Sequence, residues 1–256
     1  MGFSGYDLRA PLGRRGLLIG AGAWGLVGPT RAGAQTALER EHRIQLEVPL
    51  LAEESTAVPI SVSVNHPMEP DHFVRSIEVT VDGDPVPDKG RIVLSPASGR
   101  AWVAYQMRSG SGGVLRATVE CSKHGRFTAG QEFRVAEGGC TTPPTGGKEA
   151  IGKPVLRLPG TIRAGETVEV RAKLDHNSYT GLVLRGGKFV RELPEHYVKQ
   201  MAVYLDDQLV CDFRMTSAVS PNPLVRFALR ARTGTLRVVF INSEGLRWET
   251  TQPLRV

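Results

Sequence analysis

Cys140 has the setting best suited to chemistry in this sequence. It lies in a segment rich in glycine and proline, between two stretches with the residue pattern of β-strands. Glycine allows backbone conformations closed to other residues, and the prolines just downstream keep a chain extended and out of a sheet. We therefore expect the thiol to be presented to solvent, where it could carry a group covalently. The alternative is a surface cysteine that lies in a linker by accident.

The other two cysteines, Cys121 and Cys211, both fall in runs typical of strands. Such cysteines are usually small buried hydrophobic residues. A disulfide between them would need two domains to bring their backbones within about 7 Å, and we do not expect one. With three cysteines in the chain, at least one thiol stays unpaired.

A thiol enzyme would need a general base beside Cys140, and His66 and His176 are the natural candidates. These two histidines occupy equivalent positions in an internal repeat, although only one copy has the cysteine, so we interpret them as structural turn residues. His124 also has the setting of a turn residue. The remaining histidines show no metal-ligand spacing with any neighbour: His42, His72 and His196. We accordingly predict no catalytic residue and no metal ligand.

Residues 1–34 have the order of an export signal. Arginines come first, then the apolar run 17–27, then small residues at 32–34 that a signal peptidase recognises. The apolar run is too short for a permanent transmembrane helix. The pair Arg14 and Arg15 favours the twin-arginine route over the alternative, an ordinary Sec signal. We expect a periplasmic protein that begins near Gln35 and has no membrane span.

The charge of the chain is unevenly distributed. The formal net charge is +6, and residues 155–256 contain 15 Lys and Arg against 10 Asp and Glu, whereas residues 40–135 contain 11 against 12. No basic cluster is interleaved with stacking aromatics, so we do not expect nucleic acid as a partner. The basic half would suit an acidic partner or an anionic cargo, and a generic solvated face is the alternative.

An internal repeat divides the rest of the chain into two halves. Most segments alternate apolar and polar residues, the pattern of half-buried strands, and turn-forming residues separate them. This predicts an all-β fold of two Ig-like antiparallel β-sandwich domains of about seven strands each, with a short helical turn near 38–44. We expect the two domains to pack against each other as an intramolecular pseudo-heterodimer, with the Gly- and Pro-rich segment 136–154 crossing between them. The repeated segments are 58–66 with 168–176, 74–86 with 198–210, and 113–119 with 234–240.

Residues 155–256 resemble SoxZ, through the segment 165–170, His176 followed by Thr180-Gly181, the segment 220–223, and the closing strands. Residues 40–140 resemble SoxY, whose sandwich ends in a Gly-Gly-Cys arm, here Gly138-Gly139-Cys140. The chain thus resembles the fused SoxYZ-like carriers associated with quinoprotein dehydrogenases. The resemblance implies a signal at 1–34, a SoxY-like domain at 35–140, a linker at 141–154 and a SoxZ-like domain at 155–256.

The resemblance also implies a function in sulfur metabolism. Cys140 would hold sulfur intermediates of thiosulfate oxidation as persulfide or S-sulfonate adducts, Gly138 and Gly139 would form the hinge, and no cofactor would be needed. Partners would be periplasmic sulfur-metabolising or quinoprotein dehydrogenase-associated enzymes. In the family the arm is normally a free C-terminus, and glycines follow its cysteine. Here Thr141-Thr142-Pro143 follows the cysteine instead, and the chain continues into a second domain. An Ig-like binding or structural module is the alternative, and a thiol enzyme is a third.

Overall fold

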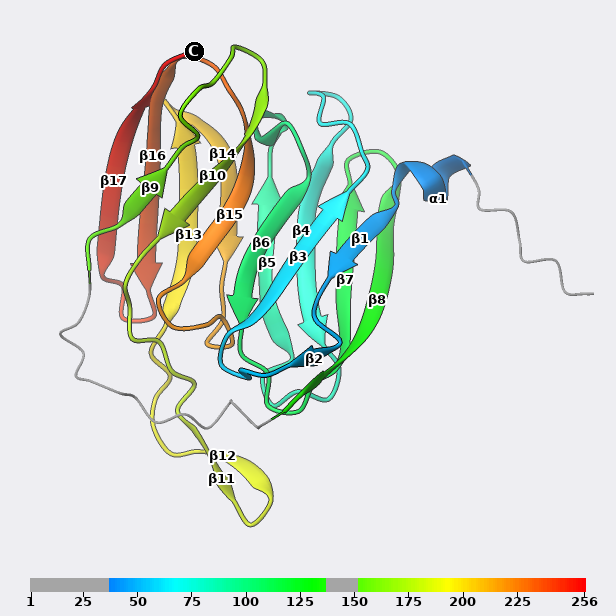
Figure 1. Cartoon of the computed structure of the whole chain (residues 1–256), viewed down its shortest axis with the longest axis vertical. Helices are drawn as coiled ribbons and strands as arrows, with labels where there is room; N and C mark the ends of the chain where they lie inside the picture. The colour runs from blue at the N-terminus through cyan, green and yellow to red at the C-terminus, as the bar shows by residue number, and fades with distance from the viewer. Residues whose placement is uncertain (1–36, 137–151) are drawn as a thin grey trace, which may run out of the picture. The chain divides into compact units, whose positions relative to one another are not determined.

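The computed structural model describes residues 37–136 and 152–256, and these residues are mostly β-strand (Figure 1). The helical elements in these ranges are α1 (Ala37–Glu41) and the short 3₁₀ turn η1 (Pro96–Ser98). The helical turn expected near residue 38 is confirmed as α1. No helix in the described ranges is long and apolar enough to cross a membrane.

The strands form two large sheets and a separate hairpin. Every pairing between named strands is antiparallel except the parallel pair of β2 with β8. The six-stranded sheet has the order β1 (Ile44–Glu47), β3 (Val58–Val64), β6 (Trp102–Met107), β15 (Leu224–Arg230), β10 (Thr167–Lys173), β9 (Val155–Arg157). The nine-stranded sheet has the order β17 (Arg247–Leu254), β16 (Gly234–Asn242), β13 (Val198–Leu205), β14 (Gln208–Arg214), β5 (Asp88–Leu94), β4 (Val74–Val81), β7 (Gly113–Cys121), β8 (Gly125–Val135), β2 (Leu51–Ala52). The hairpin consists of β11 (Leu182–Arg185) and β12 (Lys188–Arg191).

Apolar and polar residues alternate along these strands, which determines the face of each strand that is buried. In β3, Val58, Ile60, Val62 and Val64 are buried, while the residues between them are more exposed. Side chains of successive strand residues point to opposite faces, so one face of each sheet is apolar. Most of the buried apolar residues of both halves form one continuous cluster, and Trp102, Ala104 and Ala228 form a small second one. The predicted all-β fold with two sandwich halves is confirmed.

The two halves share both sheets, however, so the expectation of two sandwiches that only pack against each other is wrong. Strand β5 of the first half pairs with β14 of the second, with Leu94 opposite Cys211. Strand β6 pairs with β15, with Val103 opposite Phe227. An edge strand leaves backbone N–H and C=O groups unpaired, and each half covers such an edge of the other. The described part of the chain is accordingly one compact unit.

Gly90 marks the closest approach at this junction. Its φ is +121°, and a Cβ built there would lie 2.6 Å from a ring carbon of Phe213 and 3.0 Å from the carbonyl oxygen of Arg214. Only glycine combines this backbone angle with so little space. The pairing of β5 with β14 therefore depends on the absence of a side chain at this position.

Candidate functional site

The predicted arm residues Gly138, Gly139 and Cys140 lie outside the described residues. The structure does show how the chain reaches that segment. Strand β8 is anchored up to its end, because the Arg134 amide donates to the Leu50 carbonyl at 2.8 Å and the Ala136 amide donates to the Ala52 carbonyl at 2.9 Å. Cys140 therefore follows the last anchored residue by four positions.

Cys121 and Cys211 are both buried and both free, as expected from their strand-like runs. Burial raises the pKa of the Cys211 thiol well above its usual range. Cys211 thus behaves as a small core residue. Cys121 is different, because its sulfur contacts histidine rings.

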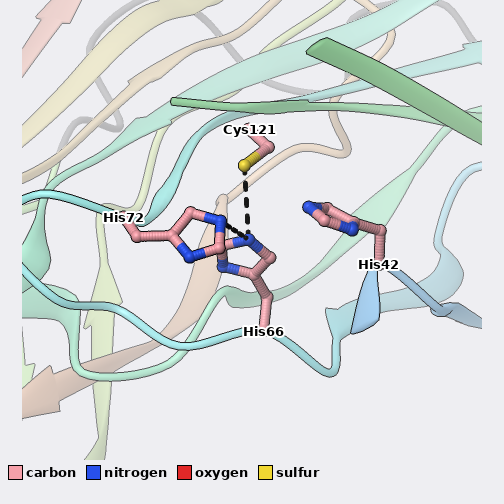
Figure 2. Close-up of side chains that lie close together, drawn as sticks. All are labelled: His42, His66, His72 and Cys121. Atoms are coloured by element: carbon pink, nitrogen blue, oxygen red, sulfur yellow. Dashed lines mark hydrogen bonds between the residues drawn. The ribbon is translucent and has the colours of Figure 1, made fainter. Parts of the chain in front are cut away.

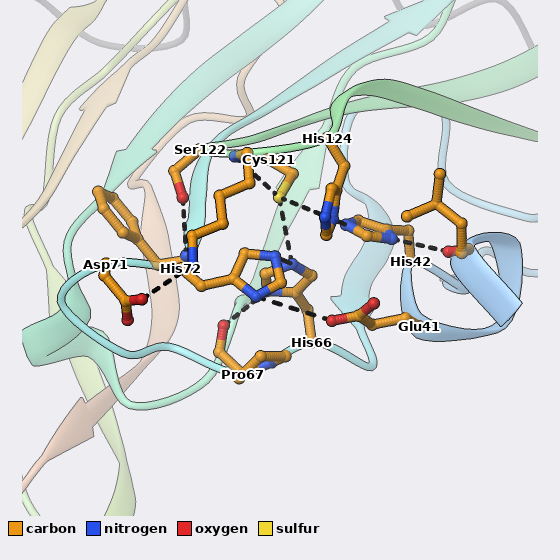
Figure 3. A network of polar contacts seen from close by, with 12 residues as sticks. Glu41, His42, His66, Pro67, Asp71, His72, Cys121, Ser122 and His124 are labelled. Atoms are coloured by element: carbon orange, nitrogen blue, oxygen red, sulfur yellow. Dashed lines mark hydrogen bonds and ion pairs between the residues drawn. The ribbon is translucent and has the colours of Figure 1, made fainter.

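Cys121 is part of a cluster with four of the six histidines in the sequence, which we call the histidine–cysteine cluster (Figures 2 and 3). Four ligand atoms, one from each of His42, His66, His72 and Cys121, lie within 4.8 Å of one another. A fifth residue, His124, contacts both His42 and Cys121. All five belong to the first half of the chain.

Strand pairing brings these five residues to one end of the first half. His66 follows β3, His72 precedes β4, Cys121 ends β7 and His124 precedes β8. In the ladders, Cys121 lies opposite Val74 at the start of β4 and opposite Gly125 at the start of β8. Antiparallel neighbours place the end of one strand beside the start of the next. The cluster therefore gathers ligands that are up to 82 residues apart.

Local sequence fixes two of these histidines. Proline restricts the residue before it to extended backbone, so Pro67 holds His66 outside any helix. His72 closes a tight turn in which its amide and carbonyl exchange hydrogen bonds with those of Glu69, both 3.0 Å. Pro70 suits the second position of such a turn.

Short contacts connect the donor atoms of the cluster. His66 Nε2 lies 3.1 Å from His72 Nε2 and 3.3 Å from Cys121 Sγ. His124 Nδ1 lies 3.3 Å from His42 Nε2 and 3.9 Å from Cys121 Sγ. Five donor atoms thus converge on a small volume, three of them Nε2, one Nδ1 and one sulfur.

Two backbone carbonyls determine the tautomers of the buried histidines. His42 Nδ1 lies 2.7 Å from the Leu38 carbonyl oxygen, and His66 Nδ1 lies 2.6 Å from the Pro67 carbonyl oxygen. A carbonyl oxygen only accepts, so each Nδ1 is assigned a proton, and Nε2 is the nitrogen left to hold a lone pair toward the cluster. Burial, with the neighbouring His42 and His72 adding to it, lowers the pKa of His66 and favours its neutral form.

The cluster is closed on one side and open on the other. His42, His66 and Cys121 are buried, whereas His72 is half-buried and His124 is exposed. The His42 ring stacks on the half-buried Phe127 ring with 4.0 Å between centroids, which gives this ring an apolar neighbour. Solvent therefore reaches the cluster from the side of His72 and His124.

Charged residues surround the open side (Figure 3). The Glu41 carboxylate lies 3.7 Å from His72 Nδ1, and Glu41, His72 and His124 each have one ligand atom within 4.8 Å of the other two. Lys123, between Cys121 and His124 in sequence, forms a 2.8 Å ion pair with Asp71. The Phe73 amide also donates to the Ser122 hydroxyl at 3.0 Å. These contacts tie the loop that carries His72 to the turn that carries Cys121 and His124.

The second half contains a reduced version of the same site. His176 and His196 stack with 4.5 Å between centroids, and both are buried. Asn242 stands where the first half has Cys121, because it ends β16 and lies opposite Val198 at the start of β13. Burial and the neighbouring His196 lower the pKa of His176 to about 4. No cysteine is present here, so the two halves have diverged at this position.

The sequence interpretation of the histidines is therefore corrected. His42 and His72 were expected to have no metal-ligand spacing, and His66 and His124 were expected to be turn residues. The structure brings all four together with Cys121. Only two short spacings in the sequence indicated such a cluster: His66 and His72 lie six residues apart, and Cys121 and His124 lie three residues apart. Each pair alone is common, and only the strand pairing unites them.

Comparisons with known proteins identify both halves. Residues 30–140 match the family model of the sulfur oxidation protein SoxY, and residues 156–253 match that of the sulphur oxidation protein SoxZ. The chain belongs to the SoxYZ proteins. It is a sulfur-oxidation protein in which SoxY and SoxZ are fused in tandem. No curated protein matches this SoxYZ chain.

Solved structures are similar to parts of this SoxYZ chain. The E23A variant of superoxide reductase (neelaredoxin) from Ignicoccus hospitalis is 28% identical, with 42% of this chain and 91% of that chain covered and a TM-score of 0.37. A putative superoxide reductase from Thermotoga maritima is 25% identical, with 39% and 89% covered and a TM-score of 0.33. The two tandem V-type regions of VCBP3 are 8% identical, with 83% and 99% covered and a TM-score of 0.25. These TM-scores do not establish a shared fold.

Proposed function

We propose that this protein is a periplasmic carrier that holds sulfur intermediates covalently on Cys140 and delivers them to partner enzymes. The observation that carries the proposal is the position of Cys140 relative to the two family matches. The SoxY match ends at residue 140, and the SoxZ match begins at residue 156. Cys140 thus terminates the SoxY part, after Gly138 and Gly139 as the hinge.

The anchoring of β8 supports a thiol that can be offered to a partner. Four residues span at most about 14 Å, so Cys140 stays within that distance of Ala136, which is tied to Ala52. The reach is short, and a partner enzyme must therefore dock close to the end of β8 and β2 to act on the thiol.

The chemistry of loading requires an enzyme with an electron acceptor. When a thiol joins the outer sulfur of thiosulfate, an S–S bond forms, one proton leaves the thiol and two electrons are removed. We predict neither a metal nor a cofactor in the arm, so a partner must take those electrons. Release proceeds by attack of another thiolate on the S–S bond. The excess of basic residues in 155–256 suits an anionic cargo.

Intact mass spectrometry tests this proposal. Protein purified from its native host under non-reducing conditions should show adduct masses that match added sulfur or sulfur oxyanions, and a thiol reductant should remove them. Cys140→Ser should abolish the adducts, while Cys211→Ser, the matched control at a buried cysteine, should retain them. An unmodified Cys140 under conditions of active sulfur oxidation would refute the carrier role. It would favour a structural or binding module instead, and turnover by the purified chain alone would favour a thiol enzyme.

The site of action follows from residues 1–34, which lie outside the described residues. We propose export to the periplasm, by the twin-arginine route through Arg14 and Arg15 or else by Sec. Proposed partners are periplasmic sulfur-metabolising enzymes or enzymes associated with quinoprotein dehydrogenases. No nucleic acid is part of this proposal.

A further inference from the structure

We propose that the histidine–cysteine cluster is a mononuclear iron centre, with His42, His66, His72, His124 and Cys121 as ligands and one coordination position open to solvent. The centre is a second functional site in the SoxY-like half, and it is separate from the proposed carrier thiol.

The distances within the cluster match those of ligands around one ion. With metal–nitrogen bonds of about 2.1 Å and metal–sulfur bonds of about 2.3 Å, adjacent donors lie roughly 3.0 to 3.6 Å apart. The contacts of His66 with His72 and with Cys121 measure 3.1 and 3.3 Å, and that of His42 with His124 measures 3.3 Å. An ion in the middle would contact the donors of His42, His66, His72 and Cys121 without large movements, and His124 would move toward it to become the fifth ligand.

The protonation pattern also fits a metal centre. The Leu38 and Pro67 carbonyls accept hydrogen bonds from Nδ1 of His42 and His66. The Nε2 atom of each ring is therefore left to offer its lone pair to an ion in the cluster. A metal ligand histidine typically donates its other N–H to a carbonyl or a carboxylate, which fixes the ring. Glu41 lies 3.7 Å from Nδ1 of His72, which is an ion-pair distance and longer than a hydrogen bond. Two of the four rings thus have a carbonyl acceptor on the outer nitrogen, and a third has a carboxylate nearby.

The second half supplies an internal comparison. It keeps two buried histidines at the corresponding end of its strands, but Asn242 replaces the cysteine and no third or fourth histidine is present in the described part of that half. The fold therefore forms without the complete ligand set. The additional histidines and the cysteine of the first half are not needed to form a sandwich of this type. We therefore infer that they bind a metal ion.

The donor set favours iron over structural zinc. Structural zinc sites are closed and have four ligands, whereas this cluster offers five donors and has an exposed side. Imidazole suits iron, copper, nickel and zinc, and iron sites with open positions occur with histidine ligands. One thiolate and the nearby Glu41 carboxylate together balance the charge of Fe²⁺. The open position would take a small anionic ligand.

The centre is out of reach of Cys140 in the same molecule. His124 precedes β8 and Ala136 follows it, so the 11 residues of β8 separate the cluster from the arm. A strand of that length spans about 35 Å, more than twice the maximum of about 14 Å that the four residues from Ala136 to Cys140 can span. The iron centre and the carrier thiol must therefore act independently within one chain, and the failure of either would leave the other intact.

Metal analysis of the full chain tests the proposal. Protein from its native host should contain one iron per chain, and after oxidation with ferricyanide it should show a visible thiolate-to-iron charge-transfer band. Azide added to the oxidised protein should shift that band, because it would enter the open position. Zinc binds most such sites more tightly than ferrous iron does, so a competition experiment with added metals cannot identify the native metal. The metal content of protein from the native host identifies it.

The second half suggests the matched variants. Cys121→Asn installs the residue that β16 carries at this position, so it should fold, lose the band and lose the iron. His124→Gln changes an exposed ligand and should weaken Fe²⁺ binding without loss of thermal stability in the metal-free protein. Glu41→Gln should weaken binding about 10-fold or more, as expected when a ligand's partner is removed. His176→Gln, Cys211→Ser and Cys140→Ser should leave iron content and spectrum unchanged.

Three results would overturn the proposal. The first is native protein without metal or with stoichiometric zinc. The second is an iron spectrum that survives Cys121→Asn in a folded protein. The third is a band that azide does not shift, which would mean that no position is open.

Discussion

Cys121 and Asn242 occupy the same position in the two halves and bond to the backbone in the same way. The Lys123 amide donates to Cys121 Sγ at 3.4 Å, and the Glu244 amide donates to Asn242 Oδ1 at 3.0 Å, in each case from two residues further on. Each residue ends its strand opposite a valine, Val74 or Val198, and each ladder shifts register just beyond that pair. The turn therefore needs an acceptor side chain, but it does not need sulfur, and the sulfur in the first half remains to be explained by its histidine neighbours.

Thiol reactivity should distinguish the three cysteines. Exposure and thiolate fraction govern alkylation, and both Cys121 and Cys211 are buried. Iodoacetamide should therefore modify one thiol per native chain, at Cys140, and all three after unfolding. Peptide mass mapping measures this, with Cys140→Ser as the control that should remove native labelling while it changes stability little. Native labelling at Cys121 or Cys211 would contradict the expectation.

Export should depend on the arginine pair. Changing both Arg14 and Arg15 to Lys should abolish delivery to the periplasm if the twin-arginine route is used, because that route reads the arginines themselves. Cell fractionation and immunoblotting measure the periplasmic share. Normal export of the double variant would show that the Sec interpretation is correct.

Lys89 should be essential for stability. It is fully buried, and its ammonium donates to Asp84 at 2.8 Å and to the Arg108 carbonyl at 2.9 Å. Lys89→Met would leave the Asp84 carboxylate buried without its counter-charge, so we expect the free energy of unfolding to fall by about 3 to 5 kcal/mol. Urea unfolding measures the loss. Adding Asp84→Asn should recover part of it, whereas a further loss would mean that the ion pair is not the cause.

Acid should destabilise the protein through His176. Its pKa is about 4 in the folded state and 6.5 unfolded, with burial and then His196 lowering it and Glu244 opposing them. As the pH falls below 6.5 the unfolded state gains the proton first, so stability decreases and the loss levels off below pH 4. Between pH 7 and pH 4 the wild type should lose about 3 kcal/mol more than His176→Gln. Parallel pH profiles for the two proteins would exclude His176 as the source.

Substitution of Gly90 should cost more folding stability than substitution of a turn glycine with open space around it. Gly90→Ala meets the Phe213 ring and the Arg214 carbonyl at a φ of +121°, so we expect a loss of about 2 to 5 kcal/mol. Gly83, with φ +76° and nothing within 4 Å of a built Cβ, is the matched control and should lose about 1 to 2 kcal/mol. Equal losses in chemical denaturation would show that the contact between β5 and β14 is not tight.

The sequence predicts individual strands better than it predicts their partners. Alternation in Val58–Val64 is a local property, and this strand lies where the pattern places it. The pairing of β5 with β14 involves residues more than a hundred positions apart, and nothing in either strand specifies the other. The site follows the same rule. In the sequence His124 resembles an ordinary turn residue and His42 has no partner at metal-ligand spacing, yet in the fold His124 Nδ1 lies 3.3 Å from His42 Nε2. The prediction for Cys140 rests on local sequence alone and stays a prediction.

The shared sheets have a consequence for how the fused chain is made. When two proteins complete each other's sheets, the strength of their association depends on how much of each is present. Covalent fusion replaces that dependence with a fixed effective concentration and guarantees one SoxZ part for every SoxY part. In this chain β5 meets β14, and β6 meets β15, as part of folding itself. Either half produced alone would present two uncovered strands to its surroundings and should self-associate through them.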